Sequence, residues 1–117
     1  MSCIVWNCRG LGNQLAVQEL AEVVTAKAPT VMFLVETLAD EARLDFVKDQ
    51  IRFDKKFFVQ RVNRGGGLVL YWENDLLIDV VSSSLNHIDV IINKDTEAAW
   101  RFTDFYGVPE THKRQES

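Results

Sequence analysis

The sequence predicts an α+β fold in which a mixed β-sheet carries two helices on one face. The first half of the chain alternates apolar β-type runs with runs of helical periodicity, in the order strand, helix, strand, helix. The second half is a series of short β-type runs that are separated by turn residues. Of the 117 residues, 47% are hydrophobic and 26% are charged, which is typical of one folded domain.

The first expected strand and helix lie near the amino terminus. Residues 3–7 form a short apolar run, and residues 9–13 have the composition of a turn. Apolar side chains then recur at helical spacing over residues 14–28, until Pro29 ends the pattern. We therefore expect a strand, a turn and a helix in this order.

The second expected strand and helix follow directly. Residues 30–35 are an apolar, β-rich run that ends at Glu36. Residues 37–40 resemble a capping box, which favours the start of a helix there. The apolar face predicted for this helix consists of Leu44, Val47 and Ile51.

The rest of the chain is expected to form a meander of strands. These are predicted over residues 57–62, 68–72, 76–81, 87–92 and 100–106. Their apolar residues fall at both odd and even positions, so both faces of the sheet need cover. Because two helices cover one face, we expect the other face to be bare. The domain is predicted to span residues 1–110, followed by a polar tail at residues 111–117.

Charge and the absence of targeting signals narrow the class of protein. The net charge of −4 argues against a protein that binds nucleic acid through a broad basic face. No secretion signal is visible, and no apolar run approaches the ~18 residues of a membrane span. We expect an intracellular protein, cytoplasmic or nuclear, that does not enter a membrane. Cys3 and Cys8 would lie ~16 Å apart along one strand, too far for a disulfide.

Asn7 and Glu36 are the candidate metal ligands. Both are predicted at the carboxyl ends of strands, which is the edge of an α/β sheet where ligands bind. A carboxylate and a carboxamide at neighbouring strand ends would suit Mg²⁺, which prefers oxygen ligands and keeps several waters. The same two residues also fit a purely structural role, in which Glu36 ends a strand and Asn7 closes a turn.

Five sequence blocks resemble the nuclease domain of plant LINE-type non-LTR retrotransposon proteins. They follow in the family's order and at its spacing, and together they extend over almost the whole chain. The blocks are residues 6–12, 31–37, 66–72, 86–90 and 100–110. The resemblance implies the endonuclease/exonuclease/phosphatase (DNase I-like) fold, a four-layer sandwich of two sheets with helices outside, of which this chain would form half.

The resemblance also implies roles for individual residues. Asn7 and Glu36 match the metal and phosphate site, and Tyr106 matches the tyrosine that contacts the scissile phosphate. Arg9 and Arg64 either approach a nucleic-acid backbone or are solvated surface charges.

Two further residues have open interpretations, and one departs from the family pattern. His87 fits a general base or, as in this family, a non-catalytic histidine at the start of a strand. Asp89 is interpreted as a polar strand residue. Asp104 stands where the family often has glycine, and its charge near Tyr106 opposes binding of an anionic substrate.

The family's second half, with its Gly-Asp-x-Asn and Ser-Asp-His blocks, does not occur in the sequence. We therefore expect a truncated, catalytically incomplete nuclease-like domain of retrotransposon origin that self-associates or binds a partner. A homodimer is expected through the bare sheet face, where the second copy replaces the missing sheet. The alternative is a Mg²⁺-dependent endonuclease or phosphodiesterase whose site a dimer mate or partner completes. Binding of nucleic acid without chemistry is not favoured, because the chain is acidic.

Overall fold

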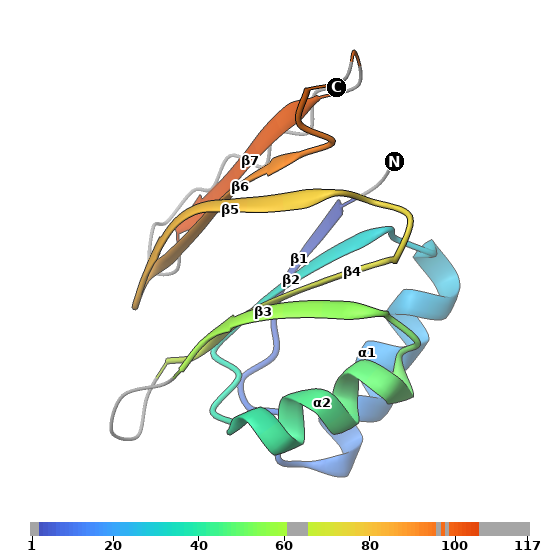
Figure 1. The fold of residues 1–117 in the computed structure, drawn as a ribbon. Coiled ribbons are helices and arrows are strands. Elements are labelled where there is room, and N and C mark those ends of the chain that lie inside the picture. Colours follow the sequence, from blue (N-terminus) through green and yellow to red (C-terminus); the bar gives the residue numbers. More distant parts are fainter. Residues whose placement is uncertain (1–2, 61–65, 96, 98, 106–117) are drawn as a thin grey trace.

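The computed structural model has two β-sheets stacked face to face and two helices on the outside of one of them (Figure 1). It describes residues 3–60, 66–95, 97 and 99–105. No helix within these ranges has the length and apolar character that a membrane crossing requires.

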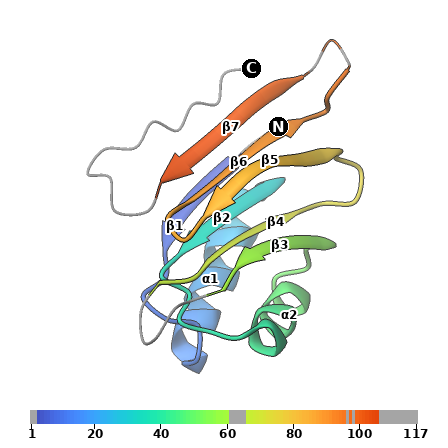
Figure 2. The same ribbon diagram turned by 60° about the vertical axis from the view of Figure 1, so that its left-hand side comes forward.

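The first sheet has four strands in the order β1-β2-β4-β3. β1 and β2 run parallel, whereas β4 is antiparallel to both β2 and β3. Helices α1 and α2 cover one face of this sheet (Figures 1 and 2). The elements are β1 (Cys3–Asn7), α1 (Gln14–Lys27), β2 (Val31–Val35), α2 (Glu41–Gln50), β3 (Lys55–Val59) and β4 (Leu68–Trp72).

The second sheet is an antiparallel meander in the order β5-β6-β7. Its strands are β5 (Ile78–Ser84), β6 (His87–Ile92) and β7 (Trp100–Phe105). A register shift between Val80 and Ser82 makes a β-bulge in β5. The two sheets lie one above the other, as Figure 2 shows from a second direction.

Two apolar clusters hold these layers together. Between the helices and the first sheet, residues such as Leu20, Leu44 and Leu34 are almost fully buried. Between the two sheets, residues such as Phe33 and Val90 are fully buried. Every residue of β2 and β4 is buried, because these two strands contribute to both clusters. That two-sided burial explains why both strands are continuous apolar runs.

The buried Tyr71 joins the first sheet to α2. Its hydroxyl donates a hydrogen bond of 2.7 Å to the carbonyl oxygen of Leu44, and its ring stacks with Phe53 at a centroid distance of 6.1 Å. Burial raises the pKa of the Tyr71 hydroxyl, so this group stays neutral and keeps donating.

The predicted α+β class and the two helices on one face are confirmed. The arrangement of the later strands differs from the expected single sheet, because the chain crosses to a second layer after β4. The face of the first sheet that lies opposite the helices is therefore covered by Ile88, Val90 and Ile92. Apolar residues at both odd and even positions predict that a strand is buried on both faces, but they do not indicate which sheet the strand joins.

Element boundaries agree with the prediction to within a few residues, with one informative exception. Helix α2 begins at Glu41 and not at the expected capping box of residues 37–40. Its N-cap is Asp40, whose Oδ1 accepts a hydrogen bond of 3.0 Å from the backbone N–H of Arg43. Thr37 is fully buried, and its backbone bonds to neighbouring loops instead of to the helix.

Candidate functional site

The structure brings Asn7 and Glu36 to the same edge of the first sheet. β1 and β2 pair in parallel, and Asn7 lies directly opposite Val35. Glu36 is the next residue, so the Cα atoms of Asn7 and Glu36 lie roughly 6 Å apart, given the usual strand spacing and rise. Asn7 is exposed and Glu36 is half-buried. The convergence predicted from the sequence is thus present in the backbone register.

Backbone hydrogen bonds join the loops that follow β1 and β2. The N–H groups of Cys8, Gly10 and Leu11 donate to the carbonyl oxygens of Val35, Glu36 and Thr37, at 3.1, 2.8 and 2.9 Å. The two loops therefore hold each other in a fixed position. These bonds also occupy the N–H groups that a phosphate-binding loop would need, so this Gly-containing loop is not an anion nest.

Asn7 itself is oriented by a local hydrogen bond. Its Oδ1 accepts from the backbone N–H of Arg9 at 3.1 Å, which is the geometry of an Asx turn. A carboxamide oxygen has two lone pairs, so this bond leaves one acceptor position for a ligand. The bond therefore fixes the direction of the side chain without using up its oxygen.

Left-handed backbone conformations gather in these loops. Glu36 has a φ of 58°, Leu38 of 48° and Arg9 of 50°. Such a conformation costs a non-glycine residue on the order of 1–3 kcal/mol and persists where the surroundings enforce it. Here hydrogen bonds of 3.1 Å from the N–H groups of Thr37 and Leu38 to the carbonyls of Gly67 and Gly66 enforce it. Strained backbone of this kind is concentrated at functional sites.

Thr37 adds an unusual buried group beside Glu36. The residue is fully buried, and its Oγ1 has no hydrogen-bond partner. An unsatisfied buried hydroxyl costs about 1–3 kcal/mol, so it is a second unfavourable feature next to the candidate carboxylate. This buried hydroxyl was not predictable from the sequence, because a capping box at residues 37–40 would place the Thr37 hydroxyl at a helix end.

Cys8 lies in the same loop but is chemically quiet. Its buried thiol donates to the carbonyl oxygen of Val35 at 3.2 Å. Burial is the main reason why the pKa of Cys8 rises to about 11, so a thiol and not a thiolate is present at neutral pH. Cys3 and Cys8 do not form a disulfide.

The donor set at this edge suits a hard cation and no soft one. It consists of one carboxylate and one carboxamide, and the described residues contain no group of three His, Cys, Asp or Glu that could enclose a metal. Zinc sites need three or four such ligands, whereas Mg²⁺ is held by one or two carboxylates together with waters and phosphate. Asn7 and Glu36 therefore fit Mg²⁺.

Of the candidate residues for phosphate and nucleic acid, only Arg9 lies in the described part of the chain. It is exposed and follows Asn7 by two residues, on the same edge as the candidate ligands. Arg64 and Tyr106 lie outside the described residues. β7 ends at Phe105, at the same end of the sandwich as the loops after β1 and β2 (Figures 1 and 2).

His87 starts β6 in the hairpin that it forms with β5. Its Nδ1 lies 2.6 Å from the hydroxyl oxygen of Ser84, and its Nε2 lies 3.1 Å from that of Ser82. Both ring nitrogens are thus engaged within the hairpin, which supports the structural interpretation of His87.

Asp89 is also engaged within the second sheet. Its buried carboxylate forms a two-bond ion pair with the exposed Arg101 on β7, in which Arg101 Nε donates at 2.9 Å and Nη2 also donates. A carboxylate bound in this way serves the packing of β6 and is not placed to act as a base.

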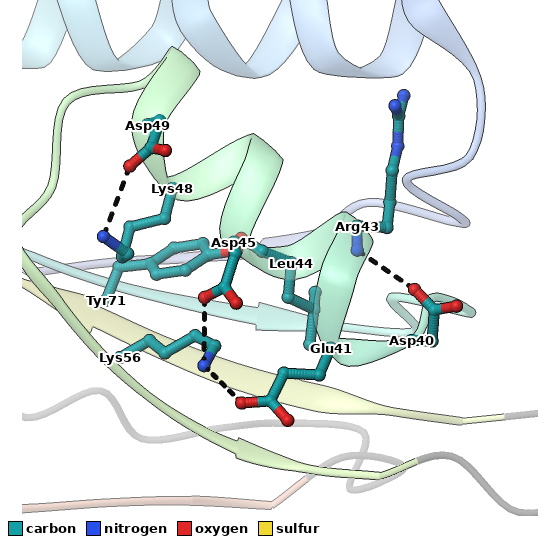
Figure 3. Close-up of polar contacts among 9 residues, drawn as sticks. All are labelled: Asp40, Glu41, Arg43, Leu44, Asp45, Lys48, Asp49, Lys56 and Tyr71. Carbon is teal, nitrogen blue, oxygen red and sulfur yellow. Dashed lines mark hydrogen bonds and ion pairs between the residues drawn. The ribbon is translucent and has the colours of Figure 1, made fainter.

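Arg43 is a residue of this region that the sequence did not reveal. Its Nε donates to the carbonyl oxygen of Leu11 at 2.7 Å, and its guanidinium carbon lies 4.8 Å from the centre of the Phe46 ring. Figure 3 shows Arg43 and Asp40 at the start of α2. Arg43 therefore attaches the loop after β1 to α2.

Lys56 makes a second attachment between α2 and the sheet. Its ammonium group lies 3.0 Å from the Glu41 carboxylate and 3.1 Å from that of Asp45, as Figure 3 shows. Burial opposes the charged form of Lys56, but the hydrogen bonds that its ammonium group donates to these two carboxylates hold its pKa above the ordinary value. Helix α2 is thus fixed to the loop after β1 through Arg43 and to β3 through Lys56.

Comparison with known proteins supports the fold. The crystal structure of the AP endonuclease LMAP from Leishmania major matches with a TM-score of 0.60 and 17% sequence identity. The match covers 91% of this chain and 40% of that chain. The chain has a partial DNase I-like fold. At 17% identity the similarity shows a shared fold and nothing more. The chain spans about two fifths of the length of that endonuclease. No family model and no curated protein matches its sequence.

Proposed function

We propose that Asn7 and Glu36 bind one Mg²⁺ ion and, through it, the phosphate group of a phosphate ester. The observation that carries this proposal is Glu36 itself, a half-buried carboxylate in a left-handed conformation one residue beyond the partner of Asn7. Strain of this kind beside an unsatisfied Thr37 hydroxyl would be selected against if the edge had only a structural role. The DNase I-like fold gives the proposal its chemical context.

In this proposal each residue has a limited task. Glu36 supplies the negative charge that attracts the cation, and the Asn7 oxygen, held by the Arg9 N–H, supplies a neutral ligand. The exposed Arg9 adds positive charge where a phosphate would approach. A bound Mg²⁺ would stabilise negative charge on the phosphate oxygens.

We further propose that the site needs groups from elsewhere for hydrolysis. A metal-assisted hydrolysis also requires a base or an oriented water. His87 and Asp89 are the candidates that the sequence offers for this base, and both are engaged in contacts of the second sheet. A nuclease-like domain that binds a cation but is catalytically incomplete fits these contacts. The alternative is a working endonuclease that a dimer mate or partner completes.

The five sequence blocks favour an origin from a plant LINE-type retrotransposon as part of the same proposal. Those blocks include the loop of Asn7 and the strand end of Glu36, which are the two segments that form the site. The origin would explain why a site of this type is present in a chain whose net charge is −4.

Binding of Mn²⁺, a paramagnetic substitute for Mg²⁺, tests the proposal directly. Electron paramagnetic resonance should detect one bound Mn²⁺ that added Mg²⁺ displaces, and Glu36→Gln should remove it. Asp75→Asn is the matched control, because this exposed carboxylate lies in the turn between β4 and β5. Equal binding by the wild type and Glu36→Gln would refute the metal site.

Nicking of supercoiled plasmid with Mg²⁺ distinguishes the two forms of the proposal. Cation binding without nicking is expected of the incomplete domain. Nicking that disappears both with EDTA and in Glu36→Gln would instead support the endonuclease. Nicking that persists in Glu36→Gln would come from a contaminating nuclease.

A further inference from the structure

The two helices end at a cavity on the far side of the first sheet from Asn7 and Glu36. β2 and β3 both begin at that end, since Val31 and Lys55 both pair with Trp72, the last residue of β4. The cavity has a volume of about 550 Å³ and lies between the ends of α1 and α2 and the residue that follows β4. Small-molecule sites have volumes of roughly 300–1,000 Å³, so this cavity is large enough for a ligand.

The lining of this cavity combines a buried apolar part with an exposed polar part. Ile51 and Phe53 are 3% and 5% exposed, and Val24 of α1 is half-buried. Arg52 is exposed and Glu73 is half-buried, and both line the same cavity. An apolar wall with a small number of polar groups is the usual composition of a small-molecule site.

Arg52 and Glu73 carry opposite charges but do not pair with each other. Neither side chain has a hydrogen-bond or ion-pair partner among the residues that the structure describes. A guanidinium group binds a carboxylate through two parallel hydrogen bonds, and a carboxylate accepts hydrogen bonds from an ammonium group. The cavity therefore matches a ligand that carries both a carboxylate and an ammonium group.

Arg52 occupies a backbone position that favours glycine. Helix α2 ends in a Schellman motif, in which the N–H groups of Phe53 and Arg52 donate to the carbonyl oxygens of Lys48 and Asp49 at 3.1 and 3.3 Å. The residue after the cap is left-handed in this motif, and Arg52 has a φ of 67°. Glycine adopts this conformation without steric cost, whereas arginine does not. Because the arginine side chain gains no partner within the described protein, the cost points to a contact with a ligand.

The two helix ends add partial negative charge to the cavity. Thr25 lies in the last turn of α1 and Gln50 is the last residue of α2, and both line the cavity. The last carbonyl groups of a helix have no partner within the helix and carry partial negative charge. They favour a cationic group, as the carboxylate of Glu73 does.

We infer that this cavity binds a free α-amino acid with an apolar side chain. The Arg52 guanidinium receives the carboxylate of the amino acid. Glu73 and the carbonyl groups at the helix ends receive its ammonium group. The apolar side chain lies against Ile51 and Phe53. The cavity is at the opposite end of the sheet from the proposed metal site, so the inference does not depend on that site.

Titration with L-phenylalanine, followed by the NMR shifts of the backbone amides, tests the inference. The shifts should saturate and should centre on Arg52 and Glu73. Phenethylamine lacks the carboxylate and hydrocinnamate lacks the ammonium group. Each should bind about tenfold more weakly than L-phenylalanine, because each leaves one charged side chain of the cavity without a partner.

Variants of the two charged residues separate binding from folding. Arg52→Gly should remain folded, because glycine favours this backbone position, yet it should bind L-phenylalanine about tenfold more weakly. Glu73→Gln should weaken binding to a similar degree. Lys55→Gln and Asp75→Asn remove exposed charges outside the cavity lining and should bind like the wild type.

Three results would overturn the inference. The first is the absence of saturable shifts at millimolar L-phenylalanine, and the second is a set of shifts that centres on another part of the molecule. The third is undiminished binding by Arg52→Gly and Glu73→Gln, or equal binding of all three compounds, since either would remove the role of the paired charges.

Discussion

The Nε atom of Arg43 donates a hydrogen bond of 2.7 Å to the carbonyl oxygen of Leu11, 32 positions earlier in the chain. This contact fixes the loop that follows Asn7, the last residue of β1, to the first turn of α2. The same guanidinium stacks on Phe46, so its orientation is defined from both sides. Arg43 thus holds the loop that follows Asn7 in place.

Replacement of Arg43 by lysine should lower both stability and cation affinity. Lysine keeps the charge but lacks the planar group that donates and stacks at the same time. We expect a loss of about 1–2 kcal/mol in the free energy of unfolding, measured with urea. The affinity for Mn²⁺ should fall several-fold, because the loop that follows Asn7 is less fixed. Arg52→Lys is the control, and an equal loss in that exposed residue would contradict the role of Arg43.

Glu36→Gly should separate stability from function. Glycine adopts a φ of 58° without the strain that a glutamate has there, so the variant should gain up to about 1 kcal/mol in the free energy of unfolding. Its Mn²⁺ signal should nevertheless disappear, since the carboxylate is gone. Arg52→Gly, at an exposed residue with a φ of 67°, should gain similar stability and keep the signal. Destabilisation in Glu36→Gly alone would show that the carboxylate has a structural role.

Thr37→Val tests the buried hydroxyl. Valine has the same shape and removes an Oγ1 that has no hydrogen-bond partner. We expect the free energy of unfolding to rise by about 1 kcal/mol, with the far-ultraviolet dichroism unchanged. Thr37→Ser keeps the hydroxyl and should show no such gain. A fall in stability for Thr37→Val would mean that the hydroxyl is bonded in solution.

The raised pKa of Cys8 predicts that the folded protein loses stability at alkaline pH. Its pKa in the folded protein is about 11, above the ordinary value of 9.0, so the thiol ionises in the unfolded chain first. The contribution of the Cys8 thiol to the free energy of unfolding is therefore fully present below pH 9. It is lost as the pH rises towards 11. The loss approaches roughly 3 kcal/mol, at 1.36 kcal/mol for each pKa unit. The free energy of unfolding of Cys8→Ala, measured with urea, should fall less between pH 9 and pH 11 than that of the wild type. An equally steep fall in both proteins would assign the effect to other groups.

The convergence of Asn7 and Glu36 was predictable because it follows from local rules. Each residue ends an apolar run that precedes a helical pattern, and the carboxyl ends of parallel strands meet at one edge. The two helices and the general order of strands were predictable for the same reason, since periodicity is a property of neighbouring residues.

Features that depend on distant residues were not predictable in this way. The Arg43 contact joins two segments that have no common pattern, and the cap of α2 moved to Asp40 because backbone bonds to Gly67 and Leu11 hold Thr37 elsewhere. Likewise, the alternating apolar pattern of a strand such as β6 is the same whether the strand extends the first sheet or starts a second one. The left-handed conformation of Glu36 is also set by tertiary contacts and has no sequence signal.

The complete burial of β2 and β4 has a consequence for the dynamics of the protein. Phe33 and Leu34 are consecutive residues, yet they belong to different apolar clusters, one on each face of β2. Because β2 contributes to both clusters, we expect the helical layer and the second sheet to be lost in one cooperative step. The backbone amides of β2 should therefore be the last to exchange with deuterium, at a rate that reports the global opening of the molecule.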